Sequence, residues 1–362
     1  MPPIAEQPIR IRFEHTLYPH WGGHSGYAQI VRHLDRERYR TVLHGPPDSN
    51  DGLPLWLKPL RPGIKYFIRR GQMPWYKVSD LHAELIAFAH CLAGQVDIVH
   101  FLDGEHSGQF LPRLLRLARL THVRTVATFH QPPDVATKLL NPKLLRRFDQ
   151  VVLMSPSQLP YFKQHVAEDR LHIILHGIDT EFFHSAPTRN RSNTIRCITV
   201  GHWLRDWEVF RAVASAMRTV AFDVVTNRPI AIDGLPNVRT HSAIDDAALA
   251  SLYRAADVLF LPLVQSTANN ALLEGIASGL PVVATDLEAV RAYLPGGEGI
   301  LVGGNHLRGF IEALTRLAGD VDARLKMGRC ARSRAEALAW PNQVRQYETL
   351  YRETLARSPN CW

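Results

Sequence analysis

The sequence predicts an α/β protein built from two doubly wound domains. Short apolar runs alternate with amphipathic segments along nearly the whole chain, a pattern typical of parallel sheets covered by helices. The length of 362 residues, of which 46% are hydrophobic, suffices for two domains that each bury a core. Residues 257–286 contain a strand, a polar loop, a helix and a second strand in close succession. The predicted function is centred on this βαβ unit.

The first domain is expected at residues 1–184. Its apolar runs predict strands at 9–13, 41–44, 96–102, 125–129, 151–154 and 172–175. Segments with helical spacing predict helices at 28–34, 81–92, 113–119 and 136–148. Pro142 lies inside the last helix and is able to split it. Residues 45–79 are rich in Pro, Gly, Trp and basic residues and are expected to be irregular.

The second domain is expected at residues 194–340, after a linker at 185–193 that is rich in Ser, Pro, Asn and Arg. The predicted strands are 195–200, 222–225, 238–240, 258–261, 281–284 and 299–302. The predicted helices are 245–256, 271–277, 306–318 and 322–339. Trp340 and Pro341 break the last of these, and a final helix is expected at 343–356, within a C-terminal segment 341–362.

The polar loop and helix inside 257–286 predict a site for a nucleotide diphosphate. A helix that begins just past the carboxyl end of a strand directs free backbone N–H groups at whatever binds there. The loop before this helix is made of small or polar residues, and those nearest the helix start are Thr267, Ala268, Asn269 and Asn270. Glu274 follows one turn into the helix, where its carboxylate can accept two hydrogen bonds from the diol of a ribose.

Charge and cysteine content narrow the classes of function. The chain has 42 Lys and Arg against 34 Asp and Glu, and this moderate excess comes with no nucleic-acid-binding motif, so nucleic acid is not an expected partner. The four cysteines are scattered and contain no Cys-x-x-Cys, so neither a disulfide framework nor a metal site is expected. No apolar signal core opens the chain and no run is long enough to span a membrane, and a cytoplasmic location is therefore expected.

Residues 257–286 resemble the C-terminal signature of the family 4 retaining glycosyltransferases. In that family, the helix start holds the diphosphate of a sugar nucleotide, and the second Glu of a Glu-(seven residues)-Glu pair holds the ribose. Glu274 matches the second Glu, whereas the first position is occupied by Ser266. The resemblance implies the GT-B fold, two Rossmann-like domains that face each other across a cleft. It also implies that the final helix crosses back onto the first domain.

Three further segments match the family in the right order. The glycine-rich loop with Gly22 and Gly23 corresponds to the loop that faces the donor diphosphate and the acceptor. His130, just past a strand, resembles the histidine that contacts the donor sugar. The octet 176–183 resembles the family's Asn-Gly-Val-Asp-x-x-x-Phe turn, with His in place of Asn.

The loop after strand 195–200 corresponds to the one that supplies an Arg and a Lys to the diphosphate in the family. Here His202 stands at the Arg position and Arg205 lies near the Lys position. An Arg side chain suits phosphate because its planar guanidinium donates two parallel hydrogen bonds. The alternative for Arg205 is a surface ion pair with Asp206.

The resemblance implies transfer of a sugar from a nucleotide diphosphate sugar to an acceptor, with retention at the anomeric carbon. We expect no cofactor and no metal, with His130, Arg205 and Glu274 acting directly on a donor linked to UDP, GDP or another nucleotide. The acceptor is a glycan, a lipid or a small molecule. The alternatives are a non-catalytic nucleotide-sugar-binding protein and a GT-B enzyme of different chemistry, such as an epimerase or a non-glycosidic coupling enzyme.

A basic segment in the first domain suggests peripheral contact with an anionic membrane. It places four cations beside four leucines: Lys138, Lys143, Arg146 and Arg147, with Leu139, Leu140, Leu144 and Leu145. Basic residues near such a surface each contribute about 1 kcal/mol to binding. The alternative is an ordinary solvated face.

Overall fold

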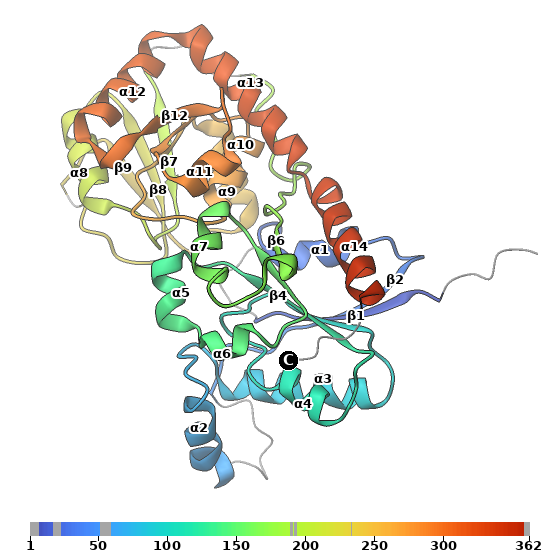
Figure 1. Ribbon diagram of the computed structural model, residues 1–362. Coiled ribbons are helices and arrows are strands. Elements are labelled where there is room, and N and C mark those ends of the chain that lie inside the picture. Colours follow the sequence, from blue (N-terminus) through green and yellow to red (C-terminus); the bar gives the residue numbers. More distant parts are fainter. Residues whose placement is uncertain are drawn as a thin grey trace, which may run out of the picture. The chain divides into compact units, whose positions relative to one another are not determined.

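The protein is described here by a computed structural model, which covers residues 7–16, 23–50, 59–188, 191, 194–232 and 234–357. The chain divides into two compact units (Figure 1). The first unit contains Met1–Trp21, Tyr27–Leu175 and Gln343–Trp362, and the second contains Gly22–Gly26 and His176–Asn342. The expected boundary at residue 184 and linker at 185–193 stay predictions, because part of that segment lies outside the described residues.

The first unit is built on a parallel sheet of six strands in the order β2-β1-β3-β4-β5-β6. The strands are β1 (Ile9–Glu14), β2 (Tyr39–His44), β3 (Ile98–Phe101), β4 (Arg124–Phe129), β5 (Gln150–Leu153) and β6 (Leu171–Ile173). All residues of β3, β4 and β5 are buried, as expected for strands covered by helices on both faces.

The two faces of this sheet have different coverings, because neighbouring residues of a strand point to opposite sides. Phe101 of β3 contacts Phe148 on one face. His100 points to the other face, where its Nδ1 lies 2.7 Å from the hydroxyl of Tyr351. Tyr351 belongs to α14 (Trp340–Ala356), which joins the first unit from Gln343 onward and is fully buried at this position.

The remaining helices of the first unit correct the sequence predictions at two places. They are α1 (Ile30–His33), α2 (Arg61–Arg69), α3 (Val78–Leu92), α4 (Leu111–Leu117), α5 (Pro133–Leu139), α6 (Pro142–Leu145) and α7 (Leu159–Phe162). The expectation of irregular structure over 45–79 was wrong at α2, where Pro62 occupies the first turn that tolerates it and Ile68 is buried. The helix expected at 136–148 is two helices, since Pro142 starts α6 behind a cap from Asn141.

The second unit has the same construction, with a parallel sheet in the order β12-β11-β10-β7-β8-β9. Its strands are β7 (Arg196–Val200), β8 (Ala221–Val225), β9 (Val238–His241), β10 (Val258–Leu261), β11 (Val282–Thr285) and β12 (Gly299–Val302). Its helices are α8 (Trp207–Ala216), α9 (Asp246–Ala255), α10 (Asn270–Ala277), α11 (Glu288–Tyr293), α12 (Leu307–Gly319) and α13 (Val321–Ala337). The sequence did not predict α8 or α11.

Alternation along β10 positions the helix that carries the predicted site. Phe260 faces the core between α8 and α12, where it contacts Phe210 and Phe310. Leu259 points to the opposite side, against α10. A Cβ on Gly275 of α10 would lie 2.5 Å from the Leu259 side chain, so only glycine allows α10 to lie this close to the strand.

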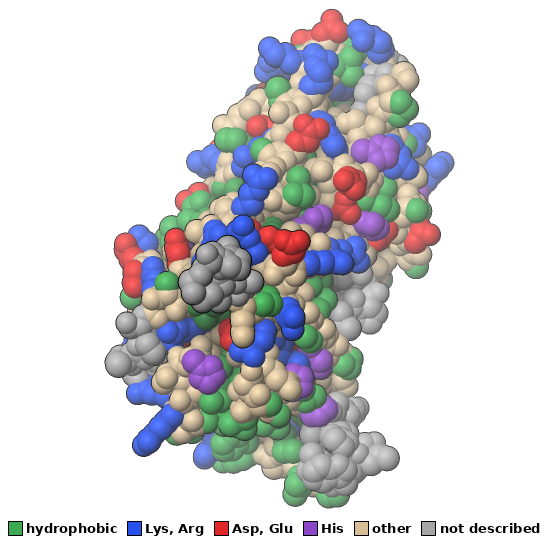
Figure 2. Space-filling view, turned by 90° about the vertical axis from the view of Figure 1, so that its right-hand side faces the viewer, with side chains coloured by type: hydrophobic (Ala, Val, Ile, Leu, Met, Phe, Trp, Pro, Cys, Tyr) green, Lys and Arg blue, Asp and Glu red, His purple; other side chains and the backbone are tan. Residues whose placement is uncertain are grey.

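The four leucines beside the basic residues of the predicted membrane-contact segment do not form an exposed apolar face. Leu139, Leu140, Leu144 and Leu145 are all buried in the core of the first unit, so they offer no apolar face to a lipid surface. In the view of Figure 2, Lys and Arg side chains are interspersed with acidic and apolar ones over the visible face. Among the described residues, no helix combines the length and the apolar character needed to cross a bilayer. Peripheral contact stays a prediction that rests on the cations alone.

Packing of α13 against α10 supports the site helix from behind, and it depends on Gly328 (Figure 1). A Cβ on this residue would lie 2.6 Å from the carbonyl oxygen of Gly279, which is backbone and cannot swing away. We predict that Gly328→Ala lowers the free energy of unfolding of the second unit by about 1–3 kcal/mol, because α13 must shift. Urea denaturation measures this change.

The matched control is Gly319→Ala at the end of α12, where a Cβ meets no atom within 4 Å. Since alanine restricts the unfolded chain more than glycine does, this variant should be unchanged or more stable by up to about 1 kcal/mol. Equal unfolding midpoints for Gly328→Ala and the wild type would contradict the proposed contact.

Candidate functional site

The strongest candidate site in the second unit lies where the strand order of its sheet reverses. The strands β7 and β10 are neighbours, and the chain leaves them toward opposite sides of the sheet. Open α/β sheets bind ligands at the carboxyl ends of the strands at such a point. The loop after β7 carries His202 and Arg205, and the loop after β10 leads into α10. The predicted residues of these two loops therefore meet at one edge.

The start of α10 is well defined. The side chain of Asn269 accepts a hydrogen bond from the backbone N–H of Leu272 at 3.3 Å, as an N-cap does. Ser266, Thr267 and Asn269 are buried, whereas Ala268 is half-buried and Asn270 is exposed. The hydroxyl of Ser266 donates to the carbonyl oxygen of Thr267 at 3.2 Å. The first turn of α10 thus directs backbone N–H groups at the edge of the sheet, as predicted for this stretch.

Arg205 lies beside this helix start. Its Nη2 donates to the carbonyl oxygen of Val200 at 2.6 Å and to Oδ1 of Asn269 at 3.3 Å. Burial lowers the pKa of Arg205 to about 10, although Tyr253 and Glu274 raise it, so the guanidinium is charged at neutral pH. The expected alternative, an ion pair with Asp206, is not formed among the described residues, since Asp206 instead caps α8.

Glu274 is nearly completely buried, and both of its carboxylate oxygens have donors. Oε2 accepts from the hydroxyl of Tyr253 at 2.8 Å, and Oε1 accepts from the hydroxyl of Ser25. Burial raises the pKa of Glu274, against these two hydrogen bonds, which lower it. Tyr253 lies in the helix predicted at 245–256, and no local signal in the sequence indicated that its hydroxyl reaches a carboxylate 21 positions later.

The glycine-rich segment belongs with the second unit and brings Ser25 to Glu274. The backbone N–H of Gly23 donates to Asp246 at 2.7 Å. His24 lies 2.7 Å from Asp179 and stacks on Phe182 at a ring distance of 3.6 Å. Gly22, the other predicted loop residue, lies outside the described residues.

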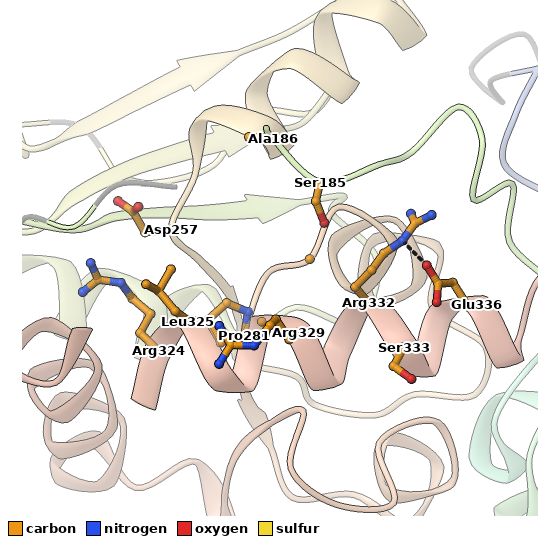
Figure 3. Close-up of a pocket in the computed structure, with 12 residues that line it drawn as sticks. Ser185, Ala186, Asp257, Pro281, Arg324, Leu325, Arg329, Arg332, Ser333 and Glu336 are labelled. Atoms are coloured by element: carbon orange, nitrogen blue, oxygen red, sulfur yellow. Dashed lines mark hydrogen bonds and ion pairs between the residues drawn. The ribbon is translucent and has the colours of Figure 1, made fainter. Parts of the chain in front are cut away.

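The turn at 176–183 is fixed against α10 by Arg332 of α13. Arg332 donates to the carbonyl oxygens of Thr180, Phe183 and Ala277 at 2.7–3.1 Å, and it pairs with Glu336 (Figure 3). The ring of Phe183 then packs edge-on to Tyr253. A pocket of about 320 Å³ lies along α13, and the described residues that line it include none of the predicted site residues.

His202 follows β7 in the same loop as Arg205, and its ring faces Trp207. Burial lowers the pKa of His202, with smaller contributions from Arg228 and Arg205, so the ring is neutral near pH 7. The ring lies 5.9 Å from that of Trp207. Its expected contact with a diphosphate stays a prediction.

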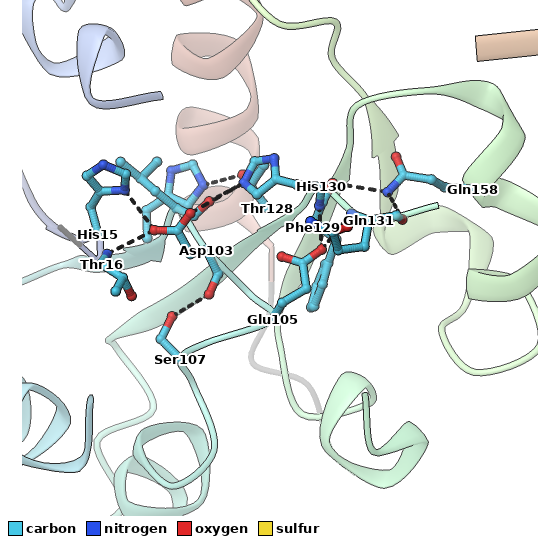
Figure 4. Close-up of polar contacts among 12 residues, drawn as sticks. His15, Thr16, Asp103, Glu105, Ser107, Thr128, Phe129, His130, Gln131 and Gln158 are labelled. Carbon is cyan, nitrogen blue, oxygen red and sulfur yellow. Dashed lines mark hydrogen bonds and ion pairs between the residues drawn. The ribbon is translucent and has the colours of Figure 1, made fainter. Parts of the chain in front are cut away.

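His130 lies in the first unit, at the carboxyl end of β4 (Figure 4). Its backbone N–H and that of Gln131 donate to Glu105 at 2.6 and 2.8 Å, which fixes the loop. The ring stacks on Tyr27 at 3.6 Å, and its Nε2 donates to the carbonyl oxygen of Leu102. Burial lowers the pKa of His130 to about 4, against the charge of Asp103, which raises it. The imidazole is therefore neutral at pH 7, with the lone pair on Nδ1.

The structure contains no group of three His, Cys, Asp or Glu residues placed to hold a metal ion, within the part of the chain that it describes. Three cysteines in this part are free thiols, of which Cys91 and Cys197 are buried. Metal-independent action stays a prediction for experiment.

Comparison with known proteins places these features in a family. The sequence profile described as Glycosyltransferase Family 4 matches residues 15–182, and that described as Glycosyl transferases group 1 matches residues 207–320. A protein of Paenarthrobacter aurescens named D-inositol 3-phosphate glycosyltransferase is 26% identical over 75% of this chain and 79% of its own. A protein of Corynebacterium glutamicum with the same name is 22% identical over 91% of this chain and 85% of its own.

Solved structures agree on the fold. A sucrose-phosphate synthase from Thermosynechococcus elongatus superposes with a TM-score of 0.72 at 16% identity, over 96% of this chain and 99% of that one. A glycosyltransferase from Rickettsia africae gives a TM-score of 0.70 at 15% identity, over 97% of this chain and all of that one. With two parallel six-stranded sheets and both family profiles in sequence order, the chain belongs to the family 4 glycosyltransferases of GT-B fold, enzymes that transfer a sugar from an activated donor.

Proposed function

We propose that this enzyme transfers a sugar from a nucleotide diphosphate sugar with retention at the anomeric carbon and without a metal ion. The observation that carries the proposal is the meeting of Arg205 with the N-cap of α10, one turn before the buried Glu274. A guanidinium, a helix start and a carboxylate at one sheet edge suit the diphosphate and the ribose of one nucleotide. A thermal-shift panel of nucleotides and nucleotide sugars identifies the nucleotide that binds, because a ligand that binds only the folded state raises its stability.

The chemical demand of the reaction is the negative charge that builds on the departing diphosphate. Backbone N–H groups at the start of α10 and the charged Arg205 are fixed before the reaction, so they stabilise this charge without reorganising. Arg205 donates to the carbonyl oxygens of Val200, at the end of β7, and of Trp203 in its own loop, which leaves the guanidinium little freedom to move. These groups take the role that a divalent cation has in other transferases.

Glu274 binds the ribose in this proposal. Its carboxylate is oriented by Tyr253 and Ser25, and each oxygen retains a further lone pair for a ribose hydroxyl. Because the acidic group is buried, its charge is maintained mainly by these donors. Bound nucleotide adds two more donors and compensates the burial of the charge.

The neutral His130 accepts a hydrogen bond from a hydroxyl of the donor sugar through Nδ1, and so positions the sugar. The acceptor hydroxyl then attacks on the face from which the diphosphate leaves. Its oxygen forms the new bond to the anomeric carbon, the bond from that carbon to the diphosphate breaks, and the proton passes to the leaving phosphate. The names of the two relatives support a small polyol as the class of acceptor.

The ribose assignment is tested by Glu274→Gln, which keeps the size of the side chain and removes its charge. Hydrogen bonds to a charged group contribute roughly 1.5–3 kcal/mol, so affinity for the nucleotide should fall tenfold or more. Isothermal titration with the nucleotide that responds in the thermal-shift panel measures the loss. Glu312→Gln on the exposed side of α12 is the control, and nucleotide affinity that is equal in both variants would refute the ribose assignment.

Glu274→Gln also identifies the part of the pH dependence of nucleotide-sugar binding that comes from Glu274. Burial raises the folded-state pKa of Glu274, so protonation on acidification should weaken binding of a nucleotide sugar at a higher pH than an ordinary glutamate would. In Glu274→Gln this part of the pH dependence should be absent. A parallel fall in both proteins would assign the titration to another group.

We predict that Arg205→Gln lowers kcat by about 10²–10³-fold, since it removes one preorganised donor to the leaving group. Arg211→Gln, on the exposed face of α8, should behave as the wild type.

Wild-type turnover should also persist in EDTA. Complete loss in EDTA that manganese or magnesium restores would overturn the metal-free mechanism.

A further prediction concerns Ser266, which stands where the family has a Glu that holds hydroxyls of the donor sugar. Ser266 is buried, so a glutamate there would be an unpaired buried charge if the native sugar lacks that hydroxyl. We therefore expect Ser266→Glu to depress turnover with the native donor, and Ser266→Ala to retain it. Higher turnover of Ser266→Glu with an ordinary hexose donor would show that the serine is only a weakened form of the family's site.

A further inference from the structure

The first unit also has a point where the strand order of its sheet reverses. The neighbouring strands β1 and β3 lead the chain toward opposite sides of the sheet. His15 and Thr16 follow β1, and Asp103 follows β3, so these three residues meet at the carboxyl edge. This is the place in an open α/β sheet where ligands bind. Of the residues at this edge, only His130 has a role in the proposed function.

Asp103 is buried there with one carboxylate oxygen that lacks a donor. Its Oδ2 accepts from the backbone N–H of Thr16 at 2.9 Å and from Nδ1 of His15 at 2.7 Å. Its Oδ1 makes no hydrogen bond to any described residue, and Nε2 of His130 approaches it only to 3.9 Å (Figure 4). That nitrogen already donates to the carbonyl oxygen of Leu102. Only 3% of Asp103 is exposed, and the lone pairs of Oδ1 are available to accept a hydrogen bond from a bound group.

The carboxyl edge of the first unit's sheet is rich in acidic residues. The described residues that directly follow the six strands are 15–16, 45–48, 102–107, 130–134, 154–157 and 174–175. They include four acidic residues, Asp48, Asp103, Glu105 and Asp134, but no Lys or Arg. Lys77 reaches the edge from α3, where it is paired with Asp48. Burial raises the pKa of Asp103, but the charge and hydrogen bond of His15, together with the charges of His130 and His106, lower it overall, so this carboxylate is ionised at neutral pH.

We propose that Asp103 binds a hydroxyl group of the acceptor through Oδ1, and that the acceptor is an uncharged polyhydroxy compound. The inference rests on the proposed function, because it assigns the acceptor side of the same reaction. A hydroxyl donates to Oδ1 and supplies the hydrogen bond that this oxygen lacks. His15 and the backbone of Thr16 hold the carboxylate in place, and His130 lies beside the hydroxyl's position.

A phosphorylated polyol fits this edge poorly. A phosphate monoester carries about −1.5 to −2 charges at neutral pH and is normally bound by Arg, Lys or a group of backbone N–H donors. Here it would meet the ionised Asp103, with no unpaired Lys or Arg among the described residues after the strands. The acceptor therefore differs in charge from the compound after which the relatives are named.

The test compares matched acceptors with the wild-type enzyme and its nucleotide-sugar donor. The pairs are myo-inositol with D-inositol 3-phosphate, and glucose with glucose 6-phosphate. We expect kcat/KM for the neutral member to exceed that of the phosphorylated member at least tenfold. Equal or better use of the phosphorylated members would overturn the inference, and this comparison requires no variant.

Asp103→Asn then tests the residue itself, because asparagine keeps the shape and removes the charge. The acceptor KM should rise about ten- to hundredfold, the range that one hydrogen bond to a charged group supplies. The rise in acceptor KM should exceed any loss in the slow hydrolysis of donor without acceptor, whereas a merely structural role would lower donor hydrolysis and acceptor use alike. The control is Asp169→Asn, a solvent-exposed aspartate of the same unit that pairs with Arg357. An unchanged acceptor KM, or equal losses in donor hydrolysis and acceptor use, would refute the role.

Failure of the proposed function gives a different result from failure of this inference. If no nucleotide sugar binds or is hydrolysed, the proposed function is wrong. Saturation-transfer NMR of the same polyol pairs with the protein alone then decides the inference, through preferential binding of the neutral member that Asp103→Asn removes. Preferential binding of the phosphorylated member, or a preference for the neutral one that Asp103→Asn leaves unchanged, overturns it.

Discussion

Parallel pairing of the strands is the constraint on which both candidate sites depend. Since all strands of a sheet run in one direction, every loop that follows a strand emerges at the same edge, and the reversal of strand order opens space there. In the second unit this constraint brings the loop after β7 to the start of α10. In the first unit it brings the end of β1 to the end of β3. Residues far apart in the sequence become neighbours without any special local signal.

Each of these edges contains a buried carboxylate that is oriented by donors from elsewhere in its unit. Glu274 is held by a hydroxyl from α9 and one from the glycine-rich segment, and Asp103 by an imidazole and a backbone N–H that follow β1. Burying such a group is unfavourable for folding alone, and apolar residues would pack the same space at lower cost. The donors fix the carboxylates in one orientation before a ligand arrives, so binding requires little further ordering.

The fold was largely predictable because its signals are local. Continuous apolar runs specify strands such as β10, and the alternating order of strands and helices specifies the class. The helix α2 was missed because its Pro and Gly residues near the start suggested a loop, although a first turn tolerates proline. The site was less predictable. Local sequence indicated the start of α10 and Glu274, but Tyr253 and Ser25 reach Glu274 only through tertiary packing, which no spacing rule contains. The same holds for the hydrogen bond between His15 and Asp103.

The helix α14 has a consequence for the order in which the protein forms on the ribosome. Tyr351 fills the face of the first sheet against Phe13, Tyr39 and His100, yet it is translated after the whole of residues 176–342. Domains usually fold as they emerge, with the N-terminal one first. Here the second unit has all but Gly22–Gly26 in one continuous stretch, whereas the first must wait with an apolar strip uncovered. We expect the nascent first unit to be the stage at which a chaperone is needed.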